Sequence, residues 1–157
     1  MAKSAFKHAS ADASPGFLLW KLTTLWRQKL EEILGRYGIN QTQYAILASL
    51  KWFEEQGEPT TQSHLVEHAK IEKMTVSKSI RLLEQAGFVL RSTSTRDQRA
   101  VAVRFTESGS KIIRKAIAAV ENADDEFFGV LNQRQLAEFK TLTADLIGKN
   151  GSSDIAG

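Results

Sequence analysis

Apolar residues recur at intervals of three and four along most of the chain, and this spacing predicts a nearly all-helical protein. The first predicted helix runs from Pro15 to about Tyr37. It begins there because Ser14-Pro15 pairs a preferred cap with a proline at the first helical position, and Gly38 ends it. A second helix is expected from Gln41 to about Phe53, because Asn40-Gln41-Thr42-Gln43 has the residue types of a capping box.

Two shorter helices are predicted in the middle of the chain. The first covers Gln62–Ala69, with Thr60 or Thr61 as its cap. The next starts at Lys73, where the preceding Glu72 supplies an acid suited to a helix N-terminus, and it stops at Gly87.

Two β-rich runs follow these helices, at residues 88–91 and 101–105, and a polar, basic loop at 92–99 joins them. Helix, turn, helix and basic hairpin is the order of a winged helix-turn-helix, in which one helix enters a groove of DNA and the hairpin reaches the next groove.

The C-terminal third is predicted to form two further helices. One starts near Thr106 and runs to about Val130, and the other follows a second capping-box sequence, Asn132-Gln133-Arg134-Gln135. Packing against a second copy of the chain is an economical way to bury their apolar residues. An intramolecular bundle is the alternative. These apolar residues are Phe127, Phe128, Leu131, Leu136, Phe139, Leu142 and Leu146.

The expected fold class is mainly α with a small β-wing: a winged helix-turn-helix flanked by N- and C-terminal dimerisation helices. We expect a flexible tail at residues 1–13, a helical dimerisation region at 14–37 and 106–148, a DNA-binding lobe at 38–105, and a flexible tail at 149–157. A two-fold dimer would place two recognition helices about one DNA turn apart and read a pseudo-palindrome.

Charge is distributed unevenly along the 157 residues. The whole chain has a net charge of +3, but residues 70–104 hold eight cations and three acids, a net charge of +5. A local excess of this kind is the footprint expected for contacts with DNA phosphates. The alternative is an ordinary solvated charged face.

Several other chemistries are excluded by what the sequence lacks. There is no cysteine, no apolar run long enough to span a membrane and no apolar region near the N-terminus typical of a secretory signal, so a cytoplasmic protein is expected. His64 and His68 are four residues apart, but Leu65 stands where a zincin motif has glutamate, so we expect no metal site. We also expect no cofactor and no enzymatic activity, because the sequence has neither a Gly-x-Ser-x-Gly motif nor a glycine-rich phosphate loop.

Four sequence segments resemble the MarR (multiple-antibiotic-resistance regulator) family, over about residues 15–148. They are Gly38–Leu47, Thr75–Lys78 with Leu82–Val89, the wing signature Asp97-Gln98-Arg99, and Phe105–Gly109 after the wing. The resemblance implies a homodimeric, ligand-responsive transcription factor, often a repressor. The chain departs from the family at Met74, where a small residue is common, at Ala86 in place of a frequent cation, and in a longer loop at Glu54–Pro59.

Residues expected to contact double-stranded DNA lie on the predicted recognition helix. Thr75 and Ser77 can bond base edges or phosphates, and Lys78 and Arg81 can reach guanine or phosphate. The alternatives are capping or surface roles for the two hydroxyls and a pair with Glu84 for Arg81. The polar set is Lys73, Thr75, Ser77, Lys78 and Arg81, and Val76, Ile80 and Leu83 are spaced to face the core.

The predicted wing carries Arg96, Asp97 and Arg99. One hypothesis is that the Asp97 carboxylate holds a neighbouring guanidinium in a fixed pose, so that Arg99 or Arg96 enters a narrow minor groove. The alternative is that Asp97 forms the turn beside ordinary surface arginines.

The resemblance also implies a pocket for a small aromatic or phenolic effector where the dimer helices meet the DNA-reading lobe. Trp20, Trp26 and Tyr44 are candidates to line it, although aromatic residues at helical spacing are more often part of a core. A different class of function, a winged-helix module that binds protein rather than DNA, is the alternative for the whole chain.

Overall fold

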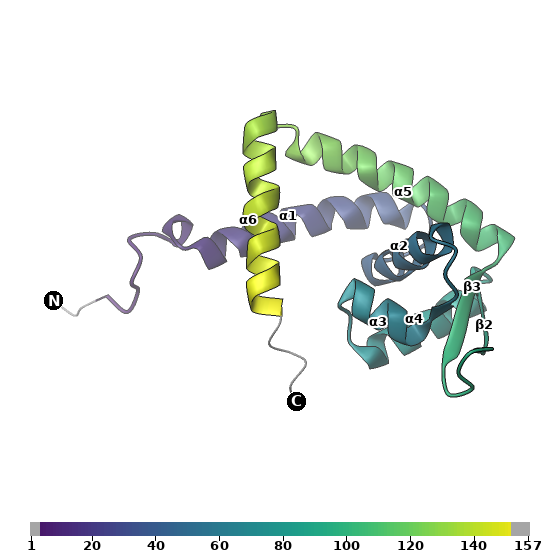
Figure 1. Ribbon diagram of the computed structural model, residues 1–157. Helices are drawn as coiled ribbons and strands as arrows, with labels where there is room; N and C mark the ends of the chain where they lie inside the picture. Colours follow the sequence, from purple (N-terminus) through teal and green to yellow (C-terminus); the bar gives the residue numbers. More distant parts are fainter. Residues whose placement is uncertain (1–3, 152–157) are drawn as a thin grey trace. The chain divides into compact units, whose positions relative to one another are not determined.

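A computed structural model describes residues 4–151 and confirms the mainly α fold with a small wing (Figure 1). In the chain order of that figure, a short 3-10 turn at Ala11–Ala13 precedes α1 (Pro15–Gly35), α2 (Gln41–Glu55), β1 (Thr60–Thr61), α3 (Gln62–Ala69), α4 (Lys73–Gln85), β2 (Val89–Thr93), β3 (Val101–Phe105), α5 (Glu107–Phe128) and α6 (Gln133–Asn150).

Side-chain caps fix the starts of most helices. Ser14 Oγ accepts a hydrogen bond from the amide of Phe17. Asn40 and Asn132 each form the complete predicted capping box, at the starts of α2 and α6. Thr61 is the cap of α3, one of the two residues predicted for that role. These caps satisfy amides that have no partner within the helix.

The structure differs from the sequence-based expectations in detail at three places. Glu72 occupies the N-cap position of α4, as predicted, but its side chain makes no cap hydrogen bond to the backbone. The strand β1 was not expected. The predicted tails are shorter than expected, because residues 11–13 form a turn and α6 continues past Gly148 to Asn150. The remainder of those tails, residues 1–3 and 152–157, lies outside the described residues.

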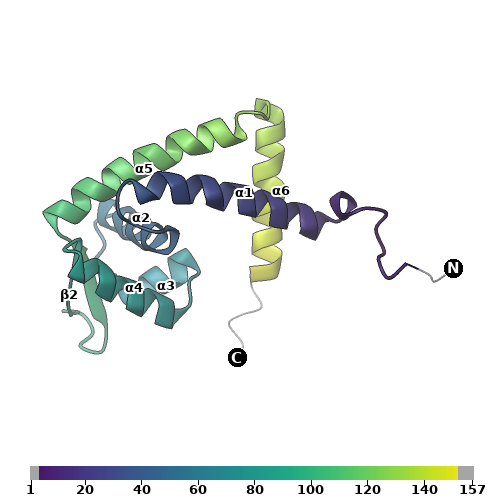
Figure 2. The ribbon, with the colours of Figure 1, turned by 180° about the vertical axis from the view of Figure 1, so that it is seen from behind.

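The three strands form an antiparallel sheet in the order β1-β3-β2, in which Thr60 pairs with Val103 and Leu90 pairs with Arg104. The β2–β3 hairpin lies beside α4 in both opposite views of the ribbon (Figure 2). Apolar side chains from α1 to α5 are fully buried in the core next to this sheet, and they include the three residues predicted on α4: Leu34, Ile46, Leu47, Leu65, Val76, Ile80, Leu83, Val89 and Ile113.

The start of α5 is fastened to the end of the helix-turn-helix. Thr106 Oγ1 donates to the carbonyl of Gly87 at 2.6 Å, and the Thr106 amide donates to the carbonyl of Phe88 at 3.1 Å. Gly109 follows one turn later and donates its amide to Thr106 Oγ1 at 3.0 Å. These bonds join α5 directly to the turn that leads from α4 into the wing.

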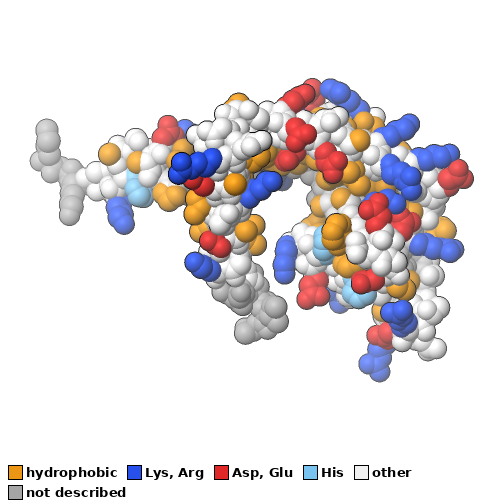
Figure 3. Space-filling view, turned by 45° about the horizontal axis from the view of Figure 1, so that its top comes forward, with side chains coloured by type: hydrophobic (Ala, Val, Ile, Leu, Met, Phe, Trp, Pro, Cys, Tyr) orange, Lys and Arg blue, Asp and Glu red, His pale blue; other side chains and the backbone are white. Residues whose placement is uncertain are grey.

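The chain forms two compact units, and the boundary between Val120 and Glu121 lies within α5. In the second unit the rings of Phe127 and Phe128 are 5.1 Å apart and those of Phe128 and Phe139 are 5.3 Å apart, which joins the end of α5 to α6. Leu142 and Leu146 on α6 remain 63 % and 64 % exposed. Apolar side chains are visible along this helix, which leads to the grey C-terminal residues (Figure 3).

Candidate nucleic-acid interface

Helix α4 has one buried and one exposed face. Val76, Ser79, Ile80 and Leu83 are buried. The opposite side of the helix, starting at Met74, carries residues spaced by four, three and four positions, as a helix with 3.6 residues per turn requires. All of these residues are exposed. We call this set the α4 face: Met74, Lys78, Arg81 and Gln85.

The five predicted contact residues of α4 are placed differently from one another. Lys78 and Arg81 stand in the α4 face, whereas Lys73 and Thr75 are exposed at its flanks and Ser77 is half-buried. Thr75 Oγ1 donates to Glu72 Oε2 at 3.0 Å, which engages the hydroxyl proton. The cations therefore dominate the exposed surface, and the two hydroxyls are less free than the sequence suggests.

Arg81 does not pair with Glu84, so that alternative is wrong: within residues 4–151, Arg81 makes no ion pair. Glu84 turns to the wing instead, where its Oε2 accepts from Arg91 Nε at 2.9 Å and from the terminal guanidinium nitrogen at 2.8 Å. The side-chain hydrogen bond from Arg91 is the main cause that lowers the pKa of Glu84 below its ordinary value, against the opposing effect of burial. This pair ties α4 to β2.

The three predicted wing residues, Arg96, Asp97 and Arg99, are all exposed in the loop between β2 and β3. Asp97 Oδ1 accepts from the backbone amide of Arg99 at 2.9 Å, and the amide of Ala100 donates to the Asp97 carbonyl at 3.0 Å. Among residues 4–151 no ion pair joins Asp97 to either arginine. The structure therefore favours the turn-forming alternative, because the carboxylate reaches the amide two residues ahead, as an Asx turn requires.

The helix α4 and the wing contribute residues to the same cavity. Lys73 from α4 and Arg99 from the wing both line a hollow of about 390 Å³, together with Gln62, Ser63 and Glu67 of α3. Gln62 Oε1 is buried there and has no hydrogen-bond partner within the described chain. No local sequence pattern points to these α3 residues, because the hollow forms only when the wing folds against the helices.

His64 and His68, which lie four residues apart on α3, each contact other side chains or backbone of the lobe. His64 Nδ1 accepts from the amide of Thr61 at 3.3 Å, which completes the capping box of α3. His68 Nδ1 lies 2.9 Å from Ser49 Oγ, and the Phe53 ring contacts both imidazoles. Within residues 4–151 there is no group of three metal-ligating side chains.

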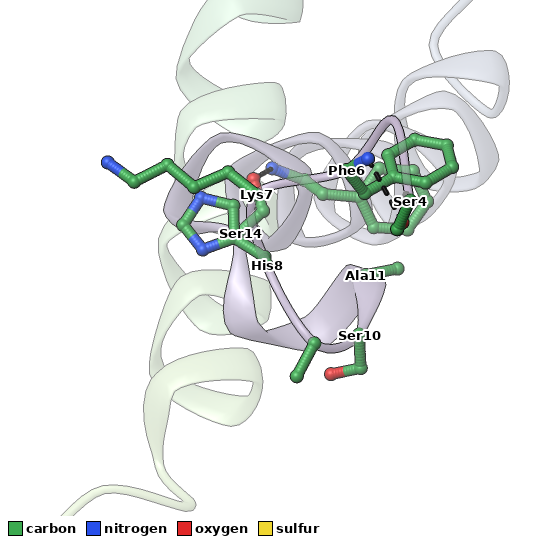
Figure 4. A pocket seen from close by; sticks show the side chains of 9 residues that line it. Ser4, Phe6, Lys7, His8, Ser10, Ala11 and Ser14 are labelled. Carbon is green, nitrogen blue, oxygen red and sulfur yellow. Dashed lines mark hydrogen bonds between the residues drawn. The ribbon is translucent and has the colours of Figure 1, made fainter. Parts of the chain in front are cut away.

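The candidate effector residues lie on α1 and α2. Trp20 is 71 % exposed, whereas Trp26 and Tyr44 are half-buried. A separate cavity of about 510 Å³ was not predicted. It is lined by the N-terminal segment from Ser4 to Ala11 together with Ser14 and Phe17, and Trp20, Trp26 and Tyr44 are not part of its wall (Figure 4).

Comparison with known proteins identifies the fold and the family. The family model described as "ArnR1-like, winged-helix domain" matches residues 35–122. The HTH-type transcriptional regulator YdcH of Bacillus subtilis is 33 % identical over 129 residues, which are 82 % of this chain and 88 % of YdcH. The chain belongs to the MarR family. Members of this family with the same fold are transcriptional regulators rather than enzymes.

Solved structures of MarR-family fold agree with this assignment. A mutant MarR from E. coli complexed with operator DNA superposes with a TM-score of 0.75 at 20 % identity, covering 84 % of this chain and 92 % of that one. Bordetella bronchiseptica BpsR, whose DNA binding is regulated by 6-hydroxynicotinic acid, gives a TM-score of 0.79 at 20 % identity, covering 90 % and 97 %. Among the helices of this MarR-family chain that the structure describes, none has the length and apolarity needed to cross a membrane.

Proposed function

We propose that this MarR-family regulator binds a pseudo-palindromic operator as a homodimer and represses transcription until a small aromatic or phenolic acid weakens its hold on DNA. The observation that carries the proposal is the α4 face, whose exposed cations lie beside a hairpin with two exposed arginines at its tip. In this proposal α4 enters the major groove, and Arg96 and Arg99 reach an adjacent minor groove.

Charge supports the DNA part of the proposal. The net charge of +5 in residues 70–104 belongs to α4, the wing and the turns around them. Lys73 and Arg99 line one hollow between α3 and the wing, so both are placed to share a single stretch of phosphate backbone. Contacts of this kind give affinity for any DNA, whereas base contacts from the α4 face give preference for a sequence.

Exposed apolar side chains on two helices support the homodimer. On α1, Leu19, Trp20 and Leu25 are exposed, and on α6, Leu142, Leu146 and Ile147 are exposed. Both helices lie in the segments expected to dimerise, 14–37 and 106–148. Several exposed apolar side chains along one helix, as on each of these two, are typical of a helix that another protein covers.

The effector is proposed from the likeness to BpsR and from the aromatic residues Trp20, Trp26 and Tyr44. If an aromatic acid binds near these residues, it should quench tryptophan fluorescence and weaken DNA binding over the same concentration range. A coupling of about 5- to 150-fold in DNA affinity is typical of allosteric regulation. Quenching without any change in DNA affinity would contradict the effector role of that compound.

An electrophoretic mobility shift decides between a regulator and a protein-interaction module. The probes are the promoter next to the protein's own gene and a random duplex of equal length. We expect both to shift at low salt, the random duplex to be released first as salt rises, and the promoter to remain bound longer. If neither duplex shifts at any salt concentration, the result would favour the protein-interaction module.

A further inference from the structure

Met74 is the one apolar residue of the α4 face, whose other members are charged or polar. It lies in the first turn of the helix, one turn before Lys78 and two turns before Arg81, and its side chain is 71 % exposed. A large apolar side chain gains nothing from exposure to solvent, and Met74 takes no part in the buried core. The side chain therefore adds bulk and apolar surface to the first turn of α4.

The start of a recognition helix is the part that reaches base edges in the major groove. The apolar group that the major groove offers is the C5 methyl of thymine, which side-chain carbons can contact. Thioether side chains are unbranched and adapt to irregular surfaces. Lys78 and Arg81, which follow Met74 in the α4 face, are exposed cations that suit a polyanion, and the polyanion of the proposed function is duplex DNA.

We propose that Met74 is a specificity-determining residue that contacts a thymine methyl group in each half-site of the operator. This inference rests on the proposed function, because it requires α4 to enter the major groove. The neighbouring hydroxyls are less exposed or already engaged: Thr75 Oγ1 donates a hydrogen bond to Glu72 Oε2 at 3.0 Å, and Ser77 is half-buried. Met74 is thus the one apolar member of the α4 face and the side chain of that face suited to contact a methyl group.

The test removes the methyl group alone. The full-length protein is titrated against its operator, in which each thymine is replaced in turn by deoxyuridine, symmetrically in both half-sites. We expect at least one position where loss of the thymine methyl group weakens operator binding by about fourfold for each methyl group removed. This factor corresponds to the free energy of burying one methyl-sized group. For the M74A variant, thymine and deoxyuridine operators should bind equally at that position. The M74L variant, which keeps an apolar side chain, should retain the preference.

L82A is a matched control, because Leu82 is an exposed apolar residue of the same helix outside the α4 face. It should leave the ratio of thymine to deoxyuridine affinity unchanged. Two results would overturn the role of Met74 while leaving the DNA-binding function standing. One is operator binding that no thymine methyl group affects. The other is a ratio of thymine to deoxyuridine affinity that is the same for M74A and for the unchanged protein. Failure of all variants and of the unchanged protein to bind any duplex would instead contradict the proposed function.

Discussion

Among the glycines that the structure describes, Gly109 has the least room for a side chain. A Cβ built there would lie 1.9 Å from the carbonyl oxygen of Phe88, at the point where α5 is fastened to the end of the helix-turn-helix. Backbone atoms on both sides must move to admit it, so Gly109→Ala should lower the free energy of unfolding by about 1–3 kcal/mol or more. Chemical denaturation of both proteins measures this difference.

Gly35→Ala is the matched control for that variant. A Cβ at Gly35 meets nothing within 4 Å, and the residue ends α1 without a left-handed backbone. Because alanine is the better helix former, this change should be neutral or stabilising by up to about 1 kcal/mol. Equal effects of the two substitutions would contradict the close packing assigned to Gly109.

Local sequence patterns predicted some individual side-chain roles and not others. Asn40 and Asn132 have their partners three residues away, so both capping boxes could be read directly from the chain. Glu84 bonds Arg91, seven residues ahead, across the turn into the wing. Helical spacing offered only Arg81 as an alternative partner of Glu84, because the return of the hairpin onto α4 has no short-range signature.

At the scale of elements, the Glu84–Arg91 pair links α4 to the wing, and its effect should depend on pH. The pKa of Glu84 is lowered in the folded protein, so the stabilisation is present above the ordinary value of 4.5 and is lost as the pH falls through the lowered pKa. Glu84→Gln should therefore lower the Tm at neutral pH, and the difference should be smaller at an acidic pH below 4.5.

Glu107→Gln is the control, because it removes an exposed pair with Lys111 on the surface of α5. Such pairs contribute little. If the Tm difference between Glu84→Gln and the unchanged protein is the same at both pH values, the pair does not provide the stabilisation described.

The wing makes a separate prediction. Arg99→Ala should weaken binding to all DNA sequences, and a dimer should lose about two units from the slope of log affinity against log salt if each arginine neutralises one phosphate.

Asp97→Ala removes the carboxylate that accepts from the Arg99 amide, so it should loosen the turn and weaken binding. Titrations of one operator at two salt concentrations measure both variants. Tighter binding by a folded Asp97→Ala variant would show that the carboxylate acts only as a repelling charge.

Elements differed in how far the sequence revealed them. The long helices and the hairpin have strong periodicity and caps, so their existence was predictable and only their ends shifted. The strand β1 is two residues long, and its pairing of Thr60 with Val103 joins segments more than forty residues apart. A two-residue strand has no alternation of its own, so only the completed sheet reveals it.

At the scale of the whole molecule, α6 should contribute to a dimer. Leu146→Glu would place a charge among the exposed apolar residues of this helix without disturbing a buried site. In sedimentation at micromolar concentration the unchanged protein should have about twice the chain mass of 17.5 kDa, and Leu146→Glu should shift it toward one chain. Thr141→Glu, an exposed polar position on α6, is the control and should remain dimeric. A monomeric unchanged protein would contradict the dimer.

The two-fold arrangement was predicted from an apolar surplus rather than from any motif. Phe127, Phe128 and Phe139 cover part of one another within the second unit, which a single chain can achieve. Leu142 and Leu146 stay exposed, and their partner belongs to the proposed second chain. Sequence periodicity shows that such residues need a neighbour, but it does not distinguish a neighbour in the same chain from one in another.

A hydroxyl-radical footprint of the protein on its own promoter tests the central claim most directly, because it reports the placement of both recognition helices at once. We predict two symmetric protected segments whose centres are separated by about 10 base pairs, one turn of DNA, with added minor-groove protection where the wings reach. A single protected segment, or uniform protection that does not depend on sequence, would contradict a dimer that reads a pseudo-palindromic operator through α4 and the wing.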